Sequence, residues 1–517
     1  MALFKNRFYW VLAAIGVATA WLALRQMHWG PWAFSDSAAY ISAARNLVAG
    51  HGLSVLEPSG SYAPLTLHQP LYPLLMAGFL AAGVHPFTST VALNLVSAFT
   101  VVFAISAGAY ALTRSKALAL LLTLTMASFP PMVDNLGGAM SEPLYLALTL
   151  MGFMFMQLYV ARQPRWALYT AAICAGLTVL TRLVGVANVA AGALALLALP
   201  PGTLKQRAAK AGIFSIIGVL PLVWLLGMPS VAGRSYSMPA DLSNSLASFW
   251  TSLVNVLGSW LPLRAVWGLP SLASKAVAAL AVLLLLGGIA AAAWQAWRQR
   301  PPAAWARLAV AASLHAAAFA LVCLAAFVFS SVTPDLNDRT LLPLFPMLAV
   351  LAGSSVLGLL ASKPQVASAT LAALGLLALL AWAPVTSRLV TERYESGHGY
   401  TATYYRGSPL LQAARALPQD VPWISNEPAL FLLYLNKQPH DLKVMYPLIL
   451  AGNNPPLGEG DTRFDEMMRD ENAILLFYPL QVKAALGESA FPHFENLLRG
   501  LHPIYDRADG SIMIYDK

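Results

Sequence analysis

Long apolar runs alternate with shorter polar connections over about the first 385 residues of the chain. A membrane-spanning helix needs ~20 mostly apolar residues. By this measure the pattern predicts eleven spanning helices, and we therefore expect an all-α polytopic membrane module over residues 1–385. The predicted spans cover residues 8–27, 88–112, 117–132, 142–161, 166–182, 184–200, 211–231, 271–296, 304–330, 340–361 and 365–385.

Two of the connections are long and contain apolar sequence that is too short to span. The first, residues 28–87, includes the apolar stretch 71–82, which we expect at the membrane interface or against the helical bundle. The second, residues 232–269, carries three tryptophans, which typically anchor a protein at the level of the lipid headgroups: Trp250, Trp260 and Trp267.

From about residue 386 the long apolar runs stop, and charged residues, Pro, Asn and Gly become more frequent. Stretches with helical and strand-like patterns alternate in this tail, so residues 386–517 are predicted to form a small α/β domain. The helical stretches are 409–417, 427–435, 463–469 and 494–501, and the strand-like ones are 422–425, 473–477, 504–506 and 511–515.

Every second connection between the predicted spans is short and basic. Because Lys and Arg concentrate in cytoplasmic loops, these connections and the N-terminus are predicted to be cytoplasmic. An odd number of spans then places the C-terminal domain on the extracytoplasmic side. The basic residues are Lys5, Arg7, Arg114, Lys116, Arg162, Arg165, Lys205, Arg207, Lys210, Arg298, Arg300 and Lys363.

Composition excludes several classes of protein. The chain of 517 residues is 58% hydrophobic and only 11% charged, whereas soluble domains carry about 25% charged residues. An ordinary cytosolic enzyme and a disordered chain are both excluded. The net charge of +9 is explained by the cytoplasmic loops, so no nucleic acid partner is expected. Cys174 and Cys323 lie inside apolar runs and form no disulfide framework or zinc pattern.

Ionisable residues gather near the predicted outer ends of the spans. Asp36 follows the first span, and Glu142 begins the fourth, shortly after Asp134. Arg182 ends the fifth span, and the pair Asp338-Arg339 comes just before the tenth.

Each of these residues also has a plain structural interpretation. Ser35 or Asp36 can cap the following helix, and Glu142-Pro143 is typical of a helix start. A single arginine at a span end often reaches for the membrane surface. Several acids and arginines at one membrane face nevertheless indicate a shared cavity, because ionisable groups at membrane depth are usually paired and functional.

Six short segments together carry a resemblance to a known family. In chain order they are Asp36 in the first outer loop, His68-Gln69-Pro70-Leu71-Tyr72-Pro73, Ser141-Glu142-Pro143, Leu180-Thr181-Arg182, Asp338-Arg339-Thr340-Leu341-Leu342-Pro343 and Trp423-Ile424-Ser425-Asn426. Their order and sidedness resemble the polyprenyl-phosphate-dependent glycosyltransferases of GT-C fold. Within that group the chain is most similar to bacterial relatives of protein O-mannosyltransferases and lipid A aminoarabinose transferases.

The resemblance implies an inverting glycosyltransferase of a bacterial inner membrane. Such an enzyme moves a sugar from a polyprenyl-phosphate donor, such as undecaprenyl phosphate, to a hydroxyl or similar group of a lipid, glycan or protein on the outer, periplasmic face. It implies Asp36 as the base and Arg182 and Arg339 as clamps for the donor phosphate. Glu142 is implied as a second catalytic carboxylate, which either orients the acceptor or shares a divalent ion with Asp36.

The same resemblance implies further roles around this site. His68, Tyr72, Asp134 and Asp338 are expected as substrate or loop residues. A divalent magnesium or manganese ion, held by Asp36, Glu142 and His68, is a further expectation, since these metals favour carboxylate ligands. No other cofactor is expected.

Two other classes of protein compete with this interpretation. A transporter or flippase of a lipid-linked or small solute typically shows inverted repeats and broken helices at mid-membrane, and the sequence shows neither clearly. A scaffold protein whose outer tail binds partners is the other alternative. Release of polyprenyl phosphate favours the enzyme, whereas movement of an intact solute favours the transporter.

Overall fold

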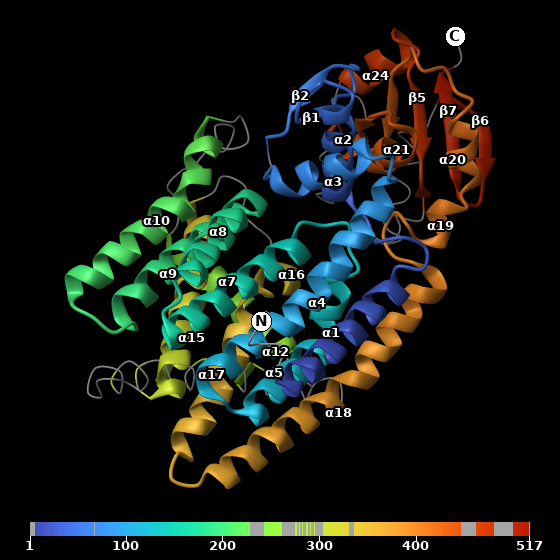
Figure 1. Cartoon of the computed structure of the whole chain (residues 1–517). Helices are drawn as coiled ribbons and strands as arrows, with labels where there is room; N and C mark the ends of the chain where they lie inside the picture. The colour runs from blue at the N-terminus through green and yellow to red at the C-terminus, as the bar shows by residue number, and fades with distance from the viewer. Residues whose placement is uncertain are drawn as a thin grey trace. The chain divides into compact units, whose positions relative to one another are not determined.

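The structure is a computed structural model. It describes residues 6–66, 68–227, 242–260, 303–329, 336–445, 462–479 and 500–515, together with isolated residues between 275 and 294. The chain forms two compact units (Figure 1). Unit 1 comprises residues 1–28, 66–72 and 90–395, and unit 2 comprises residues 29–65, 73–89 and 396–517.

Unit 1 is built from helices, and six of them are long and apolar enough to cross a membrane: α1 (Arg7–Gln26), α4 (Pro86–Thr113), α7 (Glu142–Arg162), α10 (Leu204–Leu226), α15 (Ala304–Phe329) and α18 (Pro364–Ser396). This is a multi-pass membrane protein. The remaining described helices of the unit are α5 (Lys116–Ser128), α6 (Pro130–Asn135), α8 (Arg165–Thr181), the 3₁₀ turn η1 (Leu183–Gly185), α9 (Val186–Ala198), α12 (Leu242–Ser259), α16 (Asp338–Leu341) and α17 (Leu344–Leu359).

Six of the eleven predicted spans coincide with these long helices. Four others, 117–132, 166–182, 184–200 and 340–361, coincide with shorter apolar helices, and 271–296 lies almost entirely outside the described residues. The number of eleven spans therefore stays a prediction. The apolar stretch 71–82 also forms a helix, α3 (Leu71–Ala81).

Prolines shorten two of the predicted helices. The span predicted over 117–132 ends at Ser128, because Phe129 takes an extended conformation before Pro130 and the chain starts again as α6. The span predicted over 340–361 is interrupted at Pro343, so the short α16 precedes α17. In both cases the sequence stays apolar across the position at which the helical backbone hydrogen bonds stop.

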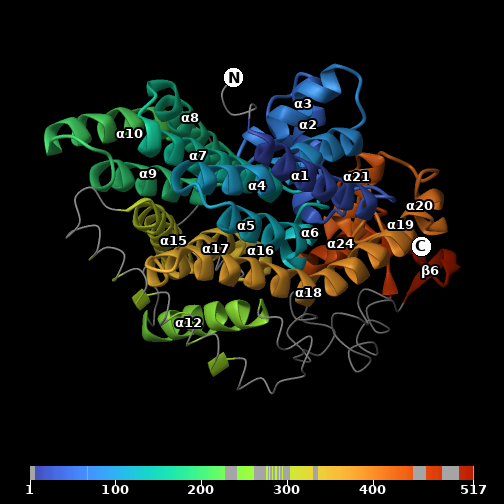
Figure 2. The same ribbon diagram turned by 60° about the horizontal axis from the view of Figure 1, so that its bottom comes forward.

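The helices α7, α8, α9 and α10 are consecutive in the chain and pack as neighbours (Figures 1 and 2). Helix α15 in turn packs against both α9 and α17. Small side chains at the buried positions, such as Ala171, Ala175 and Ala191, let these backbones come close.

The junction between α8 and α9 depends on one glycine. Arg182 leaves the helix in an extended conformation, with φ −151° and ψ 138°, and η1 then turns the chain back. A Cβ atom on Gly185 would collide with the backbone of Thr178, 2.5 Å from its carbonyl oxygen. Only glycine allows the start of α9 to pack this closely against the end of α8. This close packing fixes the position of Arg182, which lies between the two helices.

Unit 2 joins most of the first long connection to the C-terminal tail. Its elements from the connection are α2 (Ser35–Val48), β1 (Ser54–Leu56), β2 (Tyr62–Pro64) and most of α3. Its elements from the tail are α19 (Thr403–Arg406), α20 (Pro409–Ala414), β3 (Trp423–Ser425), α21 (Pro428–Leu435), β4 (His440–Asp441), α22 (Leu442–Met445), α24 (Thr462–Arg469), β5 (Ile474–Phe477), β6 (Leu501–Arg507) and β7 (Gly510–Tyr515).

The tail forms a five-stranded sheet in the order β4-β3-β5-β7-β6. Strands β4, β3 and β5 are parallel, while β7 pairs antiparallel with both β5 and β6. Helix α24 covers this sheet with Phe464, Met467 and Met468 against Ile424 and Leu475. The small α/β domain expected in the tail is thus present.

The predicted elements of the tail agree with the structure in most places. The strands expected at 422–425, 473–477, 504–506 and 511–515 all occur, although β6 is longer than expected. Of the predicted helix 494–501, Leu501 belongs to β6, and residues 494–499 lie outside the described residues. The division of the chain into 1–385 and 386–517 stays a prediction, but residues 29–65 belong to the same compact unit as residues 396–517.

We expect Gly185→Ala to destabilise unit 1 by about 1–3 kcal/mol, because the added methyl group meets rigid backbone rather than a side chain that can move. The measurement is the apparent melting temperature in detergent. Gly212→Ala within α10 is the matched control, since a Cβ atom there meets nothing within 4 Å. Equal melting temperatures for the two variants would contradict the close-packing argument.

Candidate functional site

One buried carboxylate in unit 1 binds two arginines. The Glu142 Oε1 atom lies 2.5 Å from Arg182 Nη1 and 3.1 Å from Arg339 Nε. The Ser141 hydroxyl donates to Glu142 Oε2 over 3.4 Å. The structure therefore brings together three of the residues singled out in the sequence, from positions nearly 200 residues apart.

Three local structures place these side chains. Glu142 is the first residue of α7, directly after the N-cap residue Ser141. Arg182 stands in the extended break after α8. Arg339 lies in the short α16, whose start is held by the Asn337 side chain accepting from Thr340 N over 3.0 Å. Each residue therefore lies at a helix end or in a helix break. The direction of its side chain there does not follow from the 3.6-residue period of a long helix.

Two positively charged side chains share one negatively charged side chain in this cluster. The Glu142 side chain is 6% exposed, whereas those of Arg182 and Arg339 are 29% and 35% exposed. One carboxylate faces two guanidiniums, so the three residues carry a net charge of +1. A partly exposed pair of guanidiniums is suited to bind an anion, and arginine donors match phosphate in bidentate geometry.

The two neighbouring acids have partners of their own. Asp338 accepts from the indole of Trp260 over 2.7 Å and from the Ser259 hydroxyl over 3.1 Å, which ties α16 to the end of α12. Asp134 forms an ion pair with Arg393 at 3.2 Å. In the described residues, these two acids therefore hold helix ends together around the Glu142 cluster.

Tyr72 and His68 lie in residues 66–72, the short part of the first connection that belongs to unit 1. The Tyr72 side chain is 1% exposed, and its hydroxyl donates to Thr90 Oγ1 over 3.4 Å. Its ring thus packs in the interior near the start of α4. His68 is half-buried.

Asp36 belongs to unit 2, where it stands half-buried in the first turn of α2. The helix begins at Ser35 after the N-cap residue Phe34, and Ser37 Oγ accepts from Phe34 N over 3.1 Å. Ser35 and Asp36 therefore lie inside the helix, beyond the N-cap position. A carboxylate in this first turn is favoured by the positive end of the helix dipole.

The structure as a whole is similar to two kinds of membrane protein of known structure. The crystal structure of ArnT from Cupriavidus metallidurans in the apo state is 13% identical in sequence, with a TM-score of 0.55 and 97% of each chain covered. The structure of the same protein bound to undecaprenyl phosphate gives a TM-score of 0.51, again at 13% identity and 97% coverage of each chain. The chain has the GT-C fold.

The apo oligosaccharyltransferase of Archaeoglobus fulgidus is a further similar structure. It is 12% identical, with a TM-score of 0.51, and the match covers 100% of this chain and 75% of that one. No protein-family model matches the chain, and no curated protein does. The GT-C fold that the short sequence segments indicated is thus confirmed by structural similarity, at an overall sequence identity of 12–13%.

The predicted metal ligands do not form a cluster in the described part of this GT-C chain, where no group of three or more His, Cys, Asp or Glu residues could hold a metal ion. Glu142 does not fit as a metal ligand while two guanidiniums share its carboxylate. A divalent cation there would meet repulsion of several kcal/mol from each neighbouring charge at ~4 Å. The magnesium or manganese ion stays a prediction, and no step below runs through a metal.

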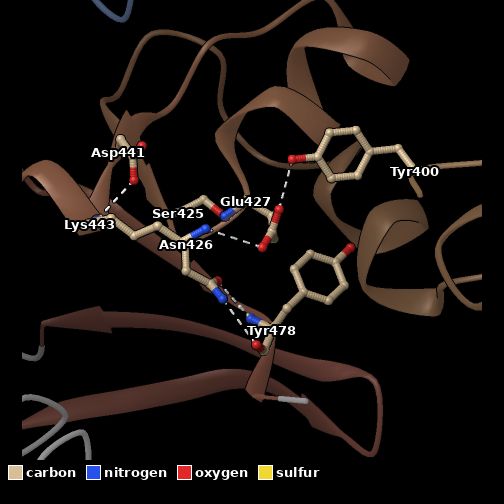
Figure 3. A network of polar contacts seen from close by, with 7 residues as sticks. All are labelled: Tyr400, Ser425, Asn426, Glu427, Asp441, Lys443 and Tyr478. Atoms are coloured by element: carbon tan, nitrogen blue, oxygen red, sulfur yellow. Dashed lines mark hydrogen bonds and ion pairs between the residues drawn. The ribbon is translucent and has the colours of Figure 1, made fainter. Parts of the chain in front are cut away.

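The sequence did not point to one polar network, which lies in unit 2 (Figure 3). Glu427, 7% exposed, accepts from the Tyr400 hydroxyl over 2.8 Å and pairs with Lys443 Nζ at 3.5 Å. The available signal was an acid two residues after the strand-like Trp423-Ile424-Ser425, because polar groups at the carboxyl ends of parallel strands often serve a site. Arg393, the partner of Asp134, had no such signal within its long helix.

We expect Glu142→Gln to lower the stability of unit 1 by about 2 kcal/mol, because two guanidiniums lose the carboxylate between them. The loss is below the ~3–5 kcal/mol typical of a fully buried pair, since both arginines remain partly solvated. Thermal unfolding in detergent measures it.

Asp134→Asn is the matched control for this substitution, because it removes the charge from a more exposed ion pair. We expect it to change stability by about 1 kcal/mol or less. A larger effect for Asp134→Asn than for Glu142→Gln would contradict the central place given to the Glu142 cluster.

Proposed function

We propose that this protein is an inverting glycosyltransferase that moves a sugar from a polyprenyl-phosphate donor to an acceptor hydroxyl. The observation that carries the proposal is the pair Arg182 and Arg339, two partly exposed guanidiniums that share the buried Glu142 carboxylate in a membrane unit. A lipid phosphate is the anion that such a unit would meet. The similar ArnT structure was determined bound to undecaprenyl phosphate, which supports this class of donor.

In the proposed reaction the acceptor oxygen forms a bond to the anomeric carbon as the bond to the phosphate oxygen breaks. Asp36 takes the proton of the acceptor hydroxyl, which requires it within hydrogen-bond reach, ~2.6–3.2 Å. The polyprenyl phosphate leaves with its electron pair, and Arg182 and Arg339 stabilise its growing charge. Attack opposite the leaving group inverts the anomeric centre.

Glu142 has a separate task in this proposal. Its carboxylate holds both guanidiniums in place side by side, the arrangement in which they would bind the phosphate. The apolar helices of unit 1 provide a surface for the prenyl chain, which needs no polar partner. The acceptor is a hydroxyl or similar group of a lipid, glycan or protein.

We further propose a bacterial inner membrane as the location, with the N-terminus cytoplasmic and the C-terminal domain periplasmic. The support is the distribution of basic residues. Short connections such as those at Arg114 and Lys116, and at Arg162 and Arg165, contain lysine and arginine without a single acid.

We expect Asp36→Asn to reduce transfer at least 100-fold while the protein remains folded, because an amide cannot accept the proton of the acceptor. The measurement is release of polyprenyl phosphate from a lipid-linked sugar by the purified protein. Glu57→Gln is the matched control, since it neutralises another acid of unit 2, whose exposed side chain accepts from the exposed Ser61 hydroxyl. Normal turnover by a folded Asp36→Asn protein would rule out Asp36 as the base.

We expect Arg339→Ala to weaken donor binding about 10- to 100-fold, because a charge-assisted hydrogen bond is worth ~1.5–3 kcal/mol. Binding of the polyprenyl-phosphate sugar to detergent-solubilised protein measures this effect. Arg393→Ala serves as the control arginine, because it lies in an ion pair with Asp134. Unchanged affinity in Arg339→Ala would remove the phosphate role, and transport of an intact lipid-linked sugar without release would favour a flippase instead.

A further inference from the structure

The chain just before Asp36 is held by a segment from the C-terminal tail of the same unit. Tyr400 N donates to the Ala33 carbonyl over 2.8 Å, and Ala33 and Gly399 form a parallel bridge. One residue further along, the Thr401 hydroxyl donates to the Pro31 carbonyl over 3.2 Å. Residues 31–33, which end three residues before Asp36, are therefore paired with residues 399–401, nearly 370 residues away in the sequence.

This approach of two backbones requires a glycine. Gly399 has φ +57°, and a Cβ atom on it would collide with the carbonyl oxygen of Ala33. A side chain at this position would separate the two segments. The pairing thus depends on the sequence of the tail as well as on that of the first connection.

The Tyr400 side chain anchors the bridging segment to the sheet (Figure 3). Its hydroxyl donates to Glu427 Oε2 over 2.8 Å, and its carbonyl accepts from the Tyr434 hydroxyl over 3.0 Å. Burial, together with the neighbouring Glu427 carboxylate, raises the pKa of Tyr400 well above its usual value. The phenol therefore remains a hydrogen-bond donor at any pH at which the protein would work.

Glu427 is itself rigidly placed. Its backbone N donates to Ser425 Oγ over 3.0 Å at the end of β3. The preceding Asn426 exchanges two hydrogen bonds with the backbone of Tyr478, each of 3.0 Å, and so ties the end of β3 to the end of β5 (Figure 3). A continuous set of short contacts thus leads from the sheet through Glu427 and Tyr400 to Ala33.

Helix α2, which carries Asp36, is also attached to the tail further along. It packs against α21, the helix that follows Glu427 (Figure 1). The Arg45 guanidinium donates to the carbonyls of Leu432 and Leu433 over 3.4 and 3.1 Å, near the end of α21. Both ends of α2 are therefore attached, directly or through Tyr400 and Glu427, to β3 and α21 of the tail.

We propose that Tyr400 and Glu427 are positioning residues for Asp36, so that the tail domain serves to hold the base of the first connection in its catalytic position. This inference rests on the proposed function, in which Asp36 accepts a proton. A base must stand within hydrogen-bond reach of the acceptor, and displacement of ~1 Å can reduce the rate about 100-fold. Asp36 lies in a segment, residues 29–65, that is part of a long connection, and contacts with the tail would fix its position.

The test replaces Tyr400 by phenylalanine, which keeps the ring and removes only the hydroxyl. We expect kcat to fall at least tenfold, while KM for the lipid-linked sugar stays within twofold because Arg182 and Arg339 are untouched. Hydrogen exchange of the peptide covering residues 31–40 should become at least tenfold faster in the purified protein. Glu427→Gln, whose amide oxygen still accepts from Tyr400, should retain most of the kcat that Glu427→Leu loses.

Tyr404→Phe is the matched control. The Tyr404 hydroxyl donates to the Asp509 carbonyl over 2.9 Å, so the variant loses a comparable hydrogen bond in the same segment without touching residues 31–33. We expect unchanged kcat and unchanged exchange in residues 31–40. If Tyr400→Phe does not fold, Thr401→Ala tests the same pairing through the lost bond to Pro31.

The results separate this inference from the proposed function. An active wild-type protein whose Tyr400→Phe variant keeps full kcat and slow exchange in residues 31–40 contradicts the positioning role alone. A wild-type protein that releases no polyprenyl phosphate from any lipid-linked sugar contradicts the proposed function, and the positioning role with it. Loss of kcat to the same extent in Tyr404→Phe would show general destabilisation and would also overturn the inference.

Discussion

The burial of the Glu142 carboxylate is the constraint on which the organisation of unit 1 depends. A charge with 6% exposure needs compensation nearby, and it has two guanidiniums at 2.5 and 3.1 Å. Supplying them requires α8 to stop at Thr181 and α16 to begin as a separate short helix before α17. The helix breaks at Arg182 and between α16 and α17 therefore supply the two arginines of the charged site.

In unit 2, contacts with the C-terminal tail give the long first connection a defined structure. Helix α2 packs against both β1 and α21, and β1 pairs with β2 in a hairpin. The sheet of the tail provides rigidity through parallel strands tied at their ends by Asn426 and Tyr478. Together these contacts give the α/β tail a physical reason to accompany a membrane module, namely support of the segment that carries Asp36.

Much of the fold could be predicted from the sequence because membrane burial leaves a strong signal. Ten of the eleven apolar runs coincide with helices, and all four expected strands of the tail occur. The errors lie where a proline or an extended residue ends a helix inside an apolar run, as at Phe129 and Pro343. Apolar periodicity reports burial, and it does not report which backbone hydrogen bonds are made.

The sequence by itself determined that the chain belongs in a membrane, where its helices run, and which ionisable residues stand at their ends. These properties follow from local composition, since each span is apolar enough to be recognised alone. Only the tertiary structure decided that Glu142, Arg182 and Arg339 meet, that Asp134 belongs to Arg393, and that Ala33 pairs with Gly399. Such partners are hundreds of residues apart or on separate helices, and their pairing depends on the direction in which each helix end projects, which no local pattern encodes.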